Sequence, residues 1–271
     1  MGGTRAALVV ATGLALAACG GTDDEGAVSS TAPPGDSPAT TAATAATAPV
    51  IDPGDGGAYA VSIDPAAFSS VIDHPFAPKL PGTVWVYEAR SSDGEVETIR
   101  VEVLDERRTI MGVETIVVHD VVTTADGTLV EDTFDWFAQD AGGNVWYFGE
   151  DTTSYDGGVA SSDGAWEAGV DGALPGIVMP AEPAVSELGY RQEYLPGEAE
   201  DMGQVIATSG SATVPAGDFT DVLMTRDWTP LEPDVVEEKT YARGVGLVLE
   251  SKVSGDGGDA TVELIEHVAP G

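Results

Sequence analysis

The chain has 271 residues, with 11 Lys or Arg against 46 Asp or Glu, and a formal net charge of -35 at pH 7. Nucleic-acid binding requires a basic patch that meets the phosphates, so this charge excludes nucleic acid as a partner. The charge also argues against docking on an anionic membrane through surface charge. Hydrophobic residues make up 42% of the chain, enough for a core, which excludes a wholly disordered protein.

The N-terminus, residues 1–18, has the pattern of a secretory signal peptide. Arg5 supplies the positive charge, and the apolar run of about ten residues that follows is too short to span a bilayer. The run ends in Leu16-Ala17-Ala18-Cys19, which resembles the bacterial lipobox. This resemblance implies that Cys19, the only cysteine, is lipidated and holds the protein at the extracytoplasmic face of the cell membrane. The alternative is an ordinary secretory signal with an incidental Cys.

Three further segments are predicted after the signal peptide. Residues 19–57 are rich in Ala, Thr and Pro and lack apolar periodicity, so we expect a disordered tether that cannot offset its ordering entropy. Residues 58–82 lead into the folded part and contain one short helix, with Asp64 as its N-cap and Pro65 at its first position. Residues 83–268 are predicted to form one β-rich domain.

The fold class predicted for this domain is all-β, mainly antiparallel and rich in hairpins. β-branched and aromatic residues alternate with polar ones, and Asp-Gly and Gly-Gly pairs supply tight turns. A sheet of this size must close, sandwich or curl, so a curved sheet, a half-barrel, a barrel and a sandwich all stay open. The strands are expected at residues 85–89, 96–104, 114–124, 128–139, 144–150, 190–195, 204–208, 219–228, 235–241, 247–253 and 261–268.

One stretch, residues 169–186, does not follow the hairpin rhythm. It is rich in Gly and Pro yet apolar, and a loop this long within a compact domain is often functional. We expect it to be either a lid over an open sheet face or a plug that completes the core.

Several longer runs of sequence resemble a family of secreted bacterial proteins of unknown function. The resemblance covers roughly residues 83–250 and implies a domain of that family, without an activity that could be transferred. The last run also resembles the final strands of half-barrel envelope lipoproteins that carry lipids. The runs are DWFAQD at 135–140, GNVWYFGED at 143–151, WEAGVDG at 166–172, YRQEY at 190–194, WTPLEP at 228–233 and YARGVGLV at 241–248.

No pattern of residues predicts a catalytic or metal site. The histidines His74, His119 and His267 have no ligand spacing, which gives zinc no support. Several aspartates lie near glycines, so calcium stays open as a cofactor, although the EF-hand order of acids is absent and hairpin turns use the same residues. Neither a Gly-x-Ser-x-Gly elbow nor a Ser-x-x-Lys pair is present.

Arg191 is a candidate ligand-binding residue because it is the only cation within residues 109–225, against 21 acidic residues. It lies in an aromatic strand in which alternation places Tyr190 and Tyr194 on one face and Arg191 and Glu193 on the other. One interpretation is a structural ion pair with Glu193 or an acid across the strand. The other is an anion-binding residue in a pocket, since a guanidinium pairs carboxylates with two hydrogen bonds.

Aromatic residues are the second candidate group. Trp136 shares a strand face with Phe134, and Trp146 shares one with Phe148, so these rings are expected to form either an aromatic wall of a ligand site or ordinary core. The predicted ligand-binding residues are therefore Arg191, Trp136, Trp146, Tyr190 and Tyr194, and no catalytic residue is predicted.

The function that these patterns favour is a non-enzymatic, membrane-anchored binding domain for a small or lipid-like ligand. The first alternative is a structural module of the envelope that binds another protein and has no pocket, and the second is a hydrolase of unknown class. The acidity indicates either a salt-rich habitat, where ions screen self-repulsion, or a cationic partner.

Overall fold

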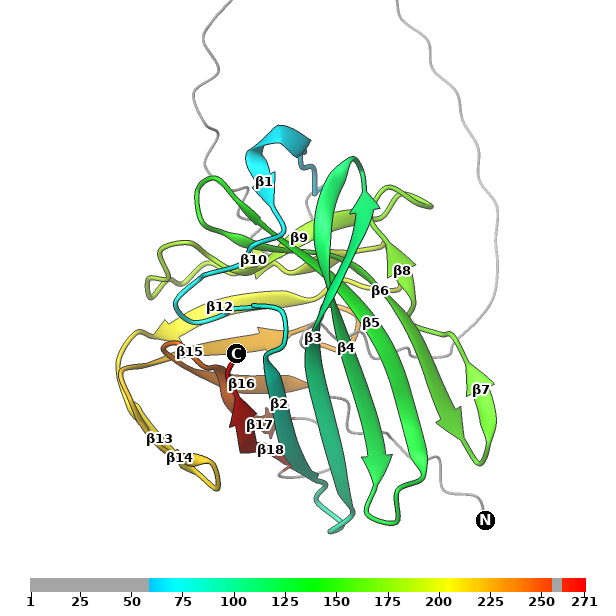
Figure 1. Ribbon diagram of the computed structural model, residues 1–271, viewed down its shortest axis with the longest axis vertical. Coiled ribbons are helices and arrows are strands. Elements are labelled where there is room, and N and C mark those ends of the chain that lie inside the picture. The colour runs from blue at the N-terminus through cyan, green and yellow to red at the C-terminus, as the bar shows by residue number, and fades with distance from the viewer. Residues whose placement is uncertain (1–58, 255–259) are drawn as a thin grey trace, which may run out of the picture.

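The computed structural model describes residues 59–254 and 260–271. The predicted signal peptide, Cys19 and the predicted tether lie outside the described residues. No helix in the described part is long and apolar enough to cross a membrane. The elements, shown in Figure 1, are η1 (Pro65–Ala67), β1 (Phe68–Ser69), β2 (Val84–Arg90), β3 (Val96–Ile110), β4 (Val113–Thr124), β5 (Leu129–Asp140), β6 (Val145–Asp156), β7 (Val159–Ser161), β8 (Trp166–Glu167), β9 (Leu174–Met179), β10 (Tyr190–Arg191), β11 (Glu193–Tyr194), β12 (Met202–Ala207), β13 (Ser211–Val214), β14 (Gly217–Thr220), β15 (Val222–Trp228), β16 (Val236–Ala242), β17 (Gly246–Ser254) and β18 (Thr261–Val268).

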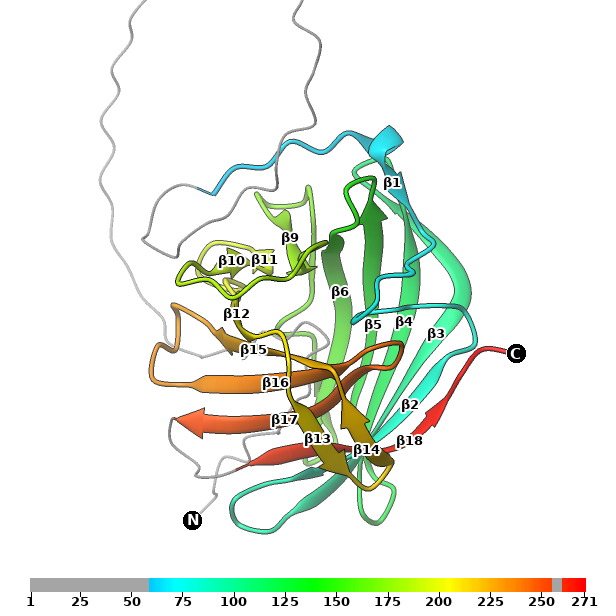
Figure 2. The same ribbon diagram turned by 90° about the vertical axis from the view of Figure 1, so that its left-hand side faces the viewer.

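The strands form an antiparallel, nearly closed barrel, as the all-β prediction allowed. Thirteen strands follow one another in the order β10-β12-β15-β16-β17-β18-β2-β3-β4-β5-β6-β9-β11. The two ends of this path, β10 and β11, are separated in the chain by Gln192 alone, so the sheet returns to its starting point. Figure 2 shows that the long strands β2 to β6 cross the shorter strands β12 and β15 to β17 steeply, so the two halves face each other across the interior.

The segment at residues 169–186 contributes a strand to the barrel wall. Its middle forms β9, which pairs with β6 on one side and with β11 on the other. It is therefore neither a loop nor a lid over an open face. The approach of β9 to the chain at Gln192 needs a glycine, since a Cβ on Gly176 would lie 2.3 Å from the Gln192 carbonyl carbon and oxygen.

A β-bulge in β5 and a break at Asp221 modify two of the expected strands. The register shifts between Asp135 and Phe137, which interrupts the alternation expected through Phe134 and Trp136. The strand expected at 219–228 is split at Asp221, whose φ is 61°, into β14 and β15. β14 pairs with β13 in a separate hairpin. These irregularities depend on pairing partners, which strand propensity does not contain.

The lead-in follows the predicted helix into the barrel. Asp64 caps η1 by accepting from the Ala66 N–H, and Pro65 lies at its start. The segment that we call the strap, residues 70–82, then crosses one end of the barrel (Figure 2). Its Pro75 carbonyl accepts a hydrogen bond from the Gly244 N–H at 2.7 Å, and His74 Nε2 lies 3.1 Å from the Pro180 carbonyl oxygen. The strap thus connects β9 with the β16–β17 turn.

Gly176→Ala tests the closure of the barrel. The added methyl group overlaps the Gln192 carbonyl, so the substitution is expected to lower the free energy of unfolding by about 1–3 kcal/mol. Chemical denaturation measures this change. Gly271→Ala is the control, since a Cβ there meets no atom within 4 Å. Equal stabilities of the two variants would contradict the close approach of β9 to Gln192.

Candidate functional site

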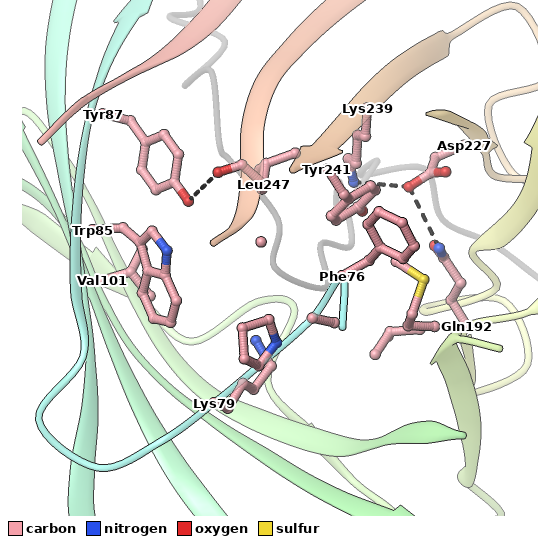
Figure 3. Close-up of a pocket in the computed structure, with 15 residues that line it drawn as sticks. Phe76, Lys79, Trp85, Tyr87, Val101, Gln192, Asp227, Lys239, Tyr241 and Leu247 are labelled. Atoms are coloured by element: carbon pink, nitrogen blue, oxygen red, sulfur yellow. Dashed lines mark hydrogen bonds and ion pairs between the residues drawn. The ribbon is translucent and has the colours of Figure 1, made fainter. Parts of the chain in front are cut away.

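The barrel contains a cavity of about 60 Å³ between its two halves and the strap. Figure 3 shows Trp85 and Tyr87 of β2 on one side, and the charged residues of β15 and β16 on the other. Lys79 of the strap and Gln192 at the point of sheet closure complete the part of the wall that is polar. The cavity therefore combines an aromatic side with a charged side, and it is built by the strap, β2, β3, β9, Gln192 and β15 to β17.

Hydrogen bonds to β17 and the turn before it hold the aromatic side in place. The Trp85 indole N–H donates to the Val245 carbonyl at 2.8 Å, and the Tyr87 hydroxyl donates to the Leu247 carbonyl at 3.1 Å. Both polar tips have protein acceptors, so what these side chains offer the cavity is chiefly ring surface. A ligand packed against them would contact rings whose orientation is already set.

An ion-pair cluster occupies the charged side. Lys239 Nζ lies 3.1 Å from Asp227 Oδ2 and 3.8 Å from Glu250 Oε2, and all three residues are buried. Burial alone lowers the pKa of Lys239, but the Asp227 and Glu250 carboxylates outweigh it and hold this pKa well above its usual value. Asp227 Oδ2 also accepts from the Gln192 amide at 3.4 Å. Asp227 Oδ1 is buried and has no hydrogen-bond partner in the described part of the chain.

Lys79 has a different environment. Its ammonium lies 4.1 Å from the centre of the Phe137 ring. Burial lowers its pKa from 10.5 to about 8, against the opposing charges of Asp135 and Asp120. Within residues 59–254 and 260–271, the ammonium makes no hydrogen bond and has no carboxylate oxygen within 4 Å. Lys79 is therefore a buried amine whose charge is only weakly compensated.

Buried acids extend from the cavity across the inner face of the barrel. Cross-strand pairs place Trp85, Val101, Asp120 and Thr133 in one row, and all four are buried. Because directly opposed residues share a face, Asp120 points inward like Trp85. Burial raises the pKa of Asp120 well above its usual value, and the negative charge of Asp135 raises this pKa further.

Glu193 is the most enclosed of these acids, with no exposed surface and no hydrogen-bond partner for either oxygen among the described residues. Burial raises its pKa from 4.5 to about 8, although the Trp166 indole and the Lys239 ammonium act in the opposite direction. In the described part of the chain, no three His, Cys, Asp or Glu side chains converge in an arrangement that could hold a metal ion. The inner acids nevertheless lie near enough to raise one another's pKa, as Asp135 does for Glu193.

Arg191, one of the five predicted site residues, lies at the closure of the barrel instead of in the cavity wall. Its side chain is buried, and its Nη1 donates to the Glu200 carbonyl at 2.7 Å and lies 3.8 Å from Glu200 Oε2. The guanidinium also lies over the Tyr194 ring at 5.1 Å and the Tyr59 ring at 6.0 Å. Tyr194 and Arg191 belong to the two end strands of the barrel path, so alternation within one strand does not describe them.

The three other predicted residues are dispersed as well, and none of them lines the cavity. Trp136 lies beneath the Arg108 guanidinium, 4.0 Å from it. The Trp146 indole donates to Asp140 at 2.8 Å and packs edge-on against Phe68. Tyr190 is buried near the charge of Asp227. A ligand-binding role for the five residues stays a prediction.

Sequence reasoning did not identify the residues that line the cavity. The rarity that singled out Arg191 applies equally to lysine, since the chain has three lysines and two of them, Lys79 and Lys239, line the cavity. The inward acids had a weaker signal. Asp120 alternates with Val118 and Val122 on β4, and all three are buried, but an acid in so acidic a chain is ordinarily expected in solvent.

Comparison with known proteins yields two similar structures. No protein-family model matches the chain, and it has no significant match among curated proteins. It is similar to a "putative exported protein with YmcC-like fold" from Bacteroides fragilis, with 15% identity and a TM-score of 0.45 over 72% of this chain and 100% of that chain. A "putative lipoprotein" from Parabacteroides distasonis has 16% identity and a TM-score of 0.39, over 72% of this chain and 100% of its own. Neither name states an activity, and at these TM-scores the likeness supports no inference about function.

The pKa of Glu193 leads to a prediction about stability and pH. Between pH 4.5 and about 8 the folded state keeps a proton that the unfolded state has released, so stability falls as the pH rises through this window. Glu193→Gln removes the titrating group and is expected to flatten this fall by up to about 1.4 kcal/mol per pH unit. Denaturation at a series of pH values measures it. Glu238→Gln, at an exposed ion pair with Arg226, should leave the slope unchanged.

Arg191→Met tests whether this side chain stabilises the closure of the barrel through its contacts with Glu200. Loss of the contacts with Glu200 is expected to lower the free energy of unfolding by about 2–4 kcal/mol. Thermal and chemical unfolding measure this loss, and Arg191→Lys should recover part of it because the charge remains. Unchanged stability of Arg191→Met would contradict this stabilising role.

Proposed function

We propose that this chain is a lipid-anchored protein of the extracytoplasmic membrane face whose barrel binds a small polar ligand in its cavity. The anchor is Cys19, after a signal peptide of residues 1–18, and residues 19–57 act as the tether. Residues 58–82 then provide the lead-in, including the strap, and residues 83–268 the binding domain. The motif at Cys19 supports the location, and the cavity supports the binding.

Asp227 is the observation that carries the binding proposal. It lines the cavity, one of its oxygens is held by Lys239, and the other is buried without a hydrogen-bond partner among the described residues. A buried acceptor without a partner costs about 1–3 kcal/mol. Asp227 Oδ1 has almost no accessible surface, so a ligand N–H or O–H in the cavity reaches it once the carboxylate turns, and this contact relieves the cost, whereas an apolar ligand leaves it in place.

Cavity size and charge favour a small, net-neutral polar molecule over a lipid-like one. A volume of about 60 Å³ corresponds to about four to six water molecules, too little for an acyl chain. Lys239 is already compensated by Asp227 and Glu250, so an anion would gain little there. An anion at Lys79 would meet the negative charges of Asp135 and Asp120. A neutral ligand with hydrogen-bonding groups on one side and an apolar face toward Trp85 and Tyr87 fits both walls.

Native mass spectrometry of the full-length protein, extracted from membranes in detergent, tests this function. We expect a small co-purifying molecule in the wild type, and at least a tenfold loss of its affinity in Asp227→Asn, which removes the charged acceptor but keeps the shape. Glu238→Gln, which removes a half-buried carboxylate on β16 that pairs with Arg226 outside the cavity wall, is the matched control and should retain the ligand.

Two results would contradict the proposal. One is equal retention of the small molecule by Asp227→Asn and the wild type. The other is a protein free of any bound molecule even after incubation with envelope extract, which would favour a structural module that binds another protein. A co-purifying lipid would instead support the lipid-like ligand.

A further inference from the structure

We propose that Lys79 is a carbonyl-reactive amine, which binds an aldehyde or ketone group of the cavity ligand covalently as an imine. This inference rests on the proposed function, because it specifies the chemistry of a ligand in the same cavity. It assigns a reactive group to the strap, which otherwise only closes one end of the barrel.

The position of Lys79 separates it from the other lysine of the cavity. Lys239 projects from β16 into two carboxylates at 3.1 and 3.8 Å, which fix its proton. Lys79 instead comes from the strap, with its backbone N–H bonded to the Ile72 carbonyl at 3.0 Å. Its ammonium faces the Phe137 ring and makes no hydrogen bond or ion pair within the described part of the chain. Of the two amines, only Lys79 is not engaged by an acid.

An amine attacks a carbonyl carbon only when it is unprotonated, and the environment of Lys79 favours that form. Burial lowers its pKa from 10.5 to about 8. Each pKa unit changes the fraction of free amine about tenfold near neutral pH, so Lys79 carries about 300 times more free amine than an ordinary lysine. Lysines that form imines in enzymes are activated by desolvation in the same way.

The inner acids supply the proton chemistry that imine formation needs. The Nζ lone pair forms a bond to the carbonyl carbon, and the carbonyl oxygen takes up a proton to give a carbinolamine. The carbon–oxygen bond then breaks, and this oxygen leaves as water with a second proton. Both protons can be those that the attacking nitrogen loses, so no oxidant or reductant is required.

Asp120 is the group suited to move these protons. Burial raises the pKa of its carboxyl well above the usual value, which favours the protonated form that can give up a proton, and its Oδ1 is buried without a partner among the described residues. It and Asp135 are the acids whose charges act on Lys79. When the imine is protonated, its positive charge takes the place of the ammonium over the Phe137 ring, where a cation is favoured.

Reductive alkylation of the full-length protein tests the proposal, because the chain has three lysines and each can be followed separately. The protein, first dialysed extensively in detergent to remove the co-purified ligand, is treated with propanal and sodium cyanoborohydride at pH 7, and peptide mass spectrometry gives the rate at each lysine. We expect Lys79 to be alkylated at least tenfold faster than Lys252, which is half-buried outside the cavity wall, and Lys239 to be the slowest. Lys79 that reacts no faster than Lys252 would overturn the proposal.

Variants separate a reactive amine from a structural one. Lys79→Arg retains the charge but cannot form an imine, and Lys79→Met retains the length of the side chain. Both should abolish the fast alkylation while Lys252 reacts as before, and thermal unfolding shows whether each variant is folded. If both variants unfold, protection of Lys79 in the wild type by the co-purified ligand serves as the second measurement. An alkylation rate at Lys79 that the ligand leaves unchanged would also overturn the proposal.

An experiment on the natural ligand separates failure of this proposal from failure of the binding function on which it rests. Borohydride reduction of the freshly extracted protein should convert the co-purifying molecule into a covalent adduct on Lys79. A ligand that stays non-covalent after reduction, and that Lys79→Met still binds with wild-type affinity, would overturn the imine and leave the binding function intact. A protein without any ligand would contradict the binding function, whereas propanal labelling still decides the reactivity of Lys79.

Discussion

The burial of ionisable side chains inside a nearly closed barrel is the constraint on which the rest of this structure depends. In an apolar interior a charge must be paired or neutralised, because its desolvation is costly. Lys239, Asp227 and Glu250 meet this requirement by pairing, and Glu193 meets it through a raised pKa. Lys79 meets it least completely, since an aromatic ring is its nearest favourable contact. The chemistry proposed for the cavity follows from this difference between two lysines.

The residues that close the barrel also build part of the site. The sheet path ends on either side of Gln192, whose amide contacts Asp227 in the cavity wall. Arg191 lies next to it, between Glu200 and the rings of Tyr59 and Tyr194. The strap then closes one end and brings Lys79 inside. A change that loosens the closure therefore also disturbs the charged wall, which is why stability must be measured beside binding.

Much of the fold could be predicted from the sequence, and little of the site could. The alternating strands, the glycine turns and the Asp64 cap of η1 are local features, and they agree with the structure. The five predicted ligand-binding residues were chosen by rarity or aromatic character, and none of them lines the cavity, although Arg191 and Tyr194 lie together at the closure of the barrel. Trp136 packs under Arg108, and Trp146 packs against Phe68. These contacts could not be predicted, because the covering residues come from other parts of the chain.

By itself, the sequence determined the all-β class and the positions of most strands, since these follow from short-range alternation. Only the tertiary structure decided that the sheet closes, that residues 169–186 supply β9, and that Lys79 lies inside the barrel. The physical reason is that closure depends on long-range pairing across bulges. Whether an acid or a lysine faces water or the interior is decided by which distant strand it meets.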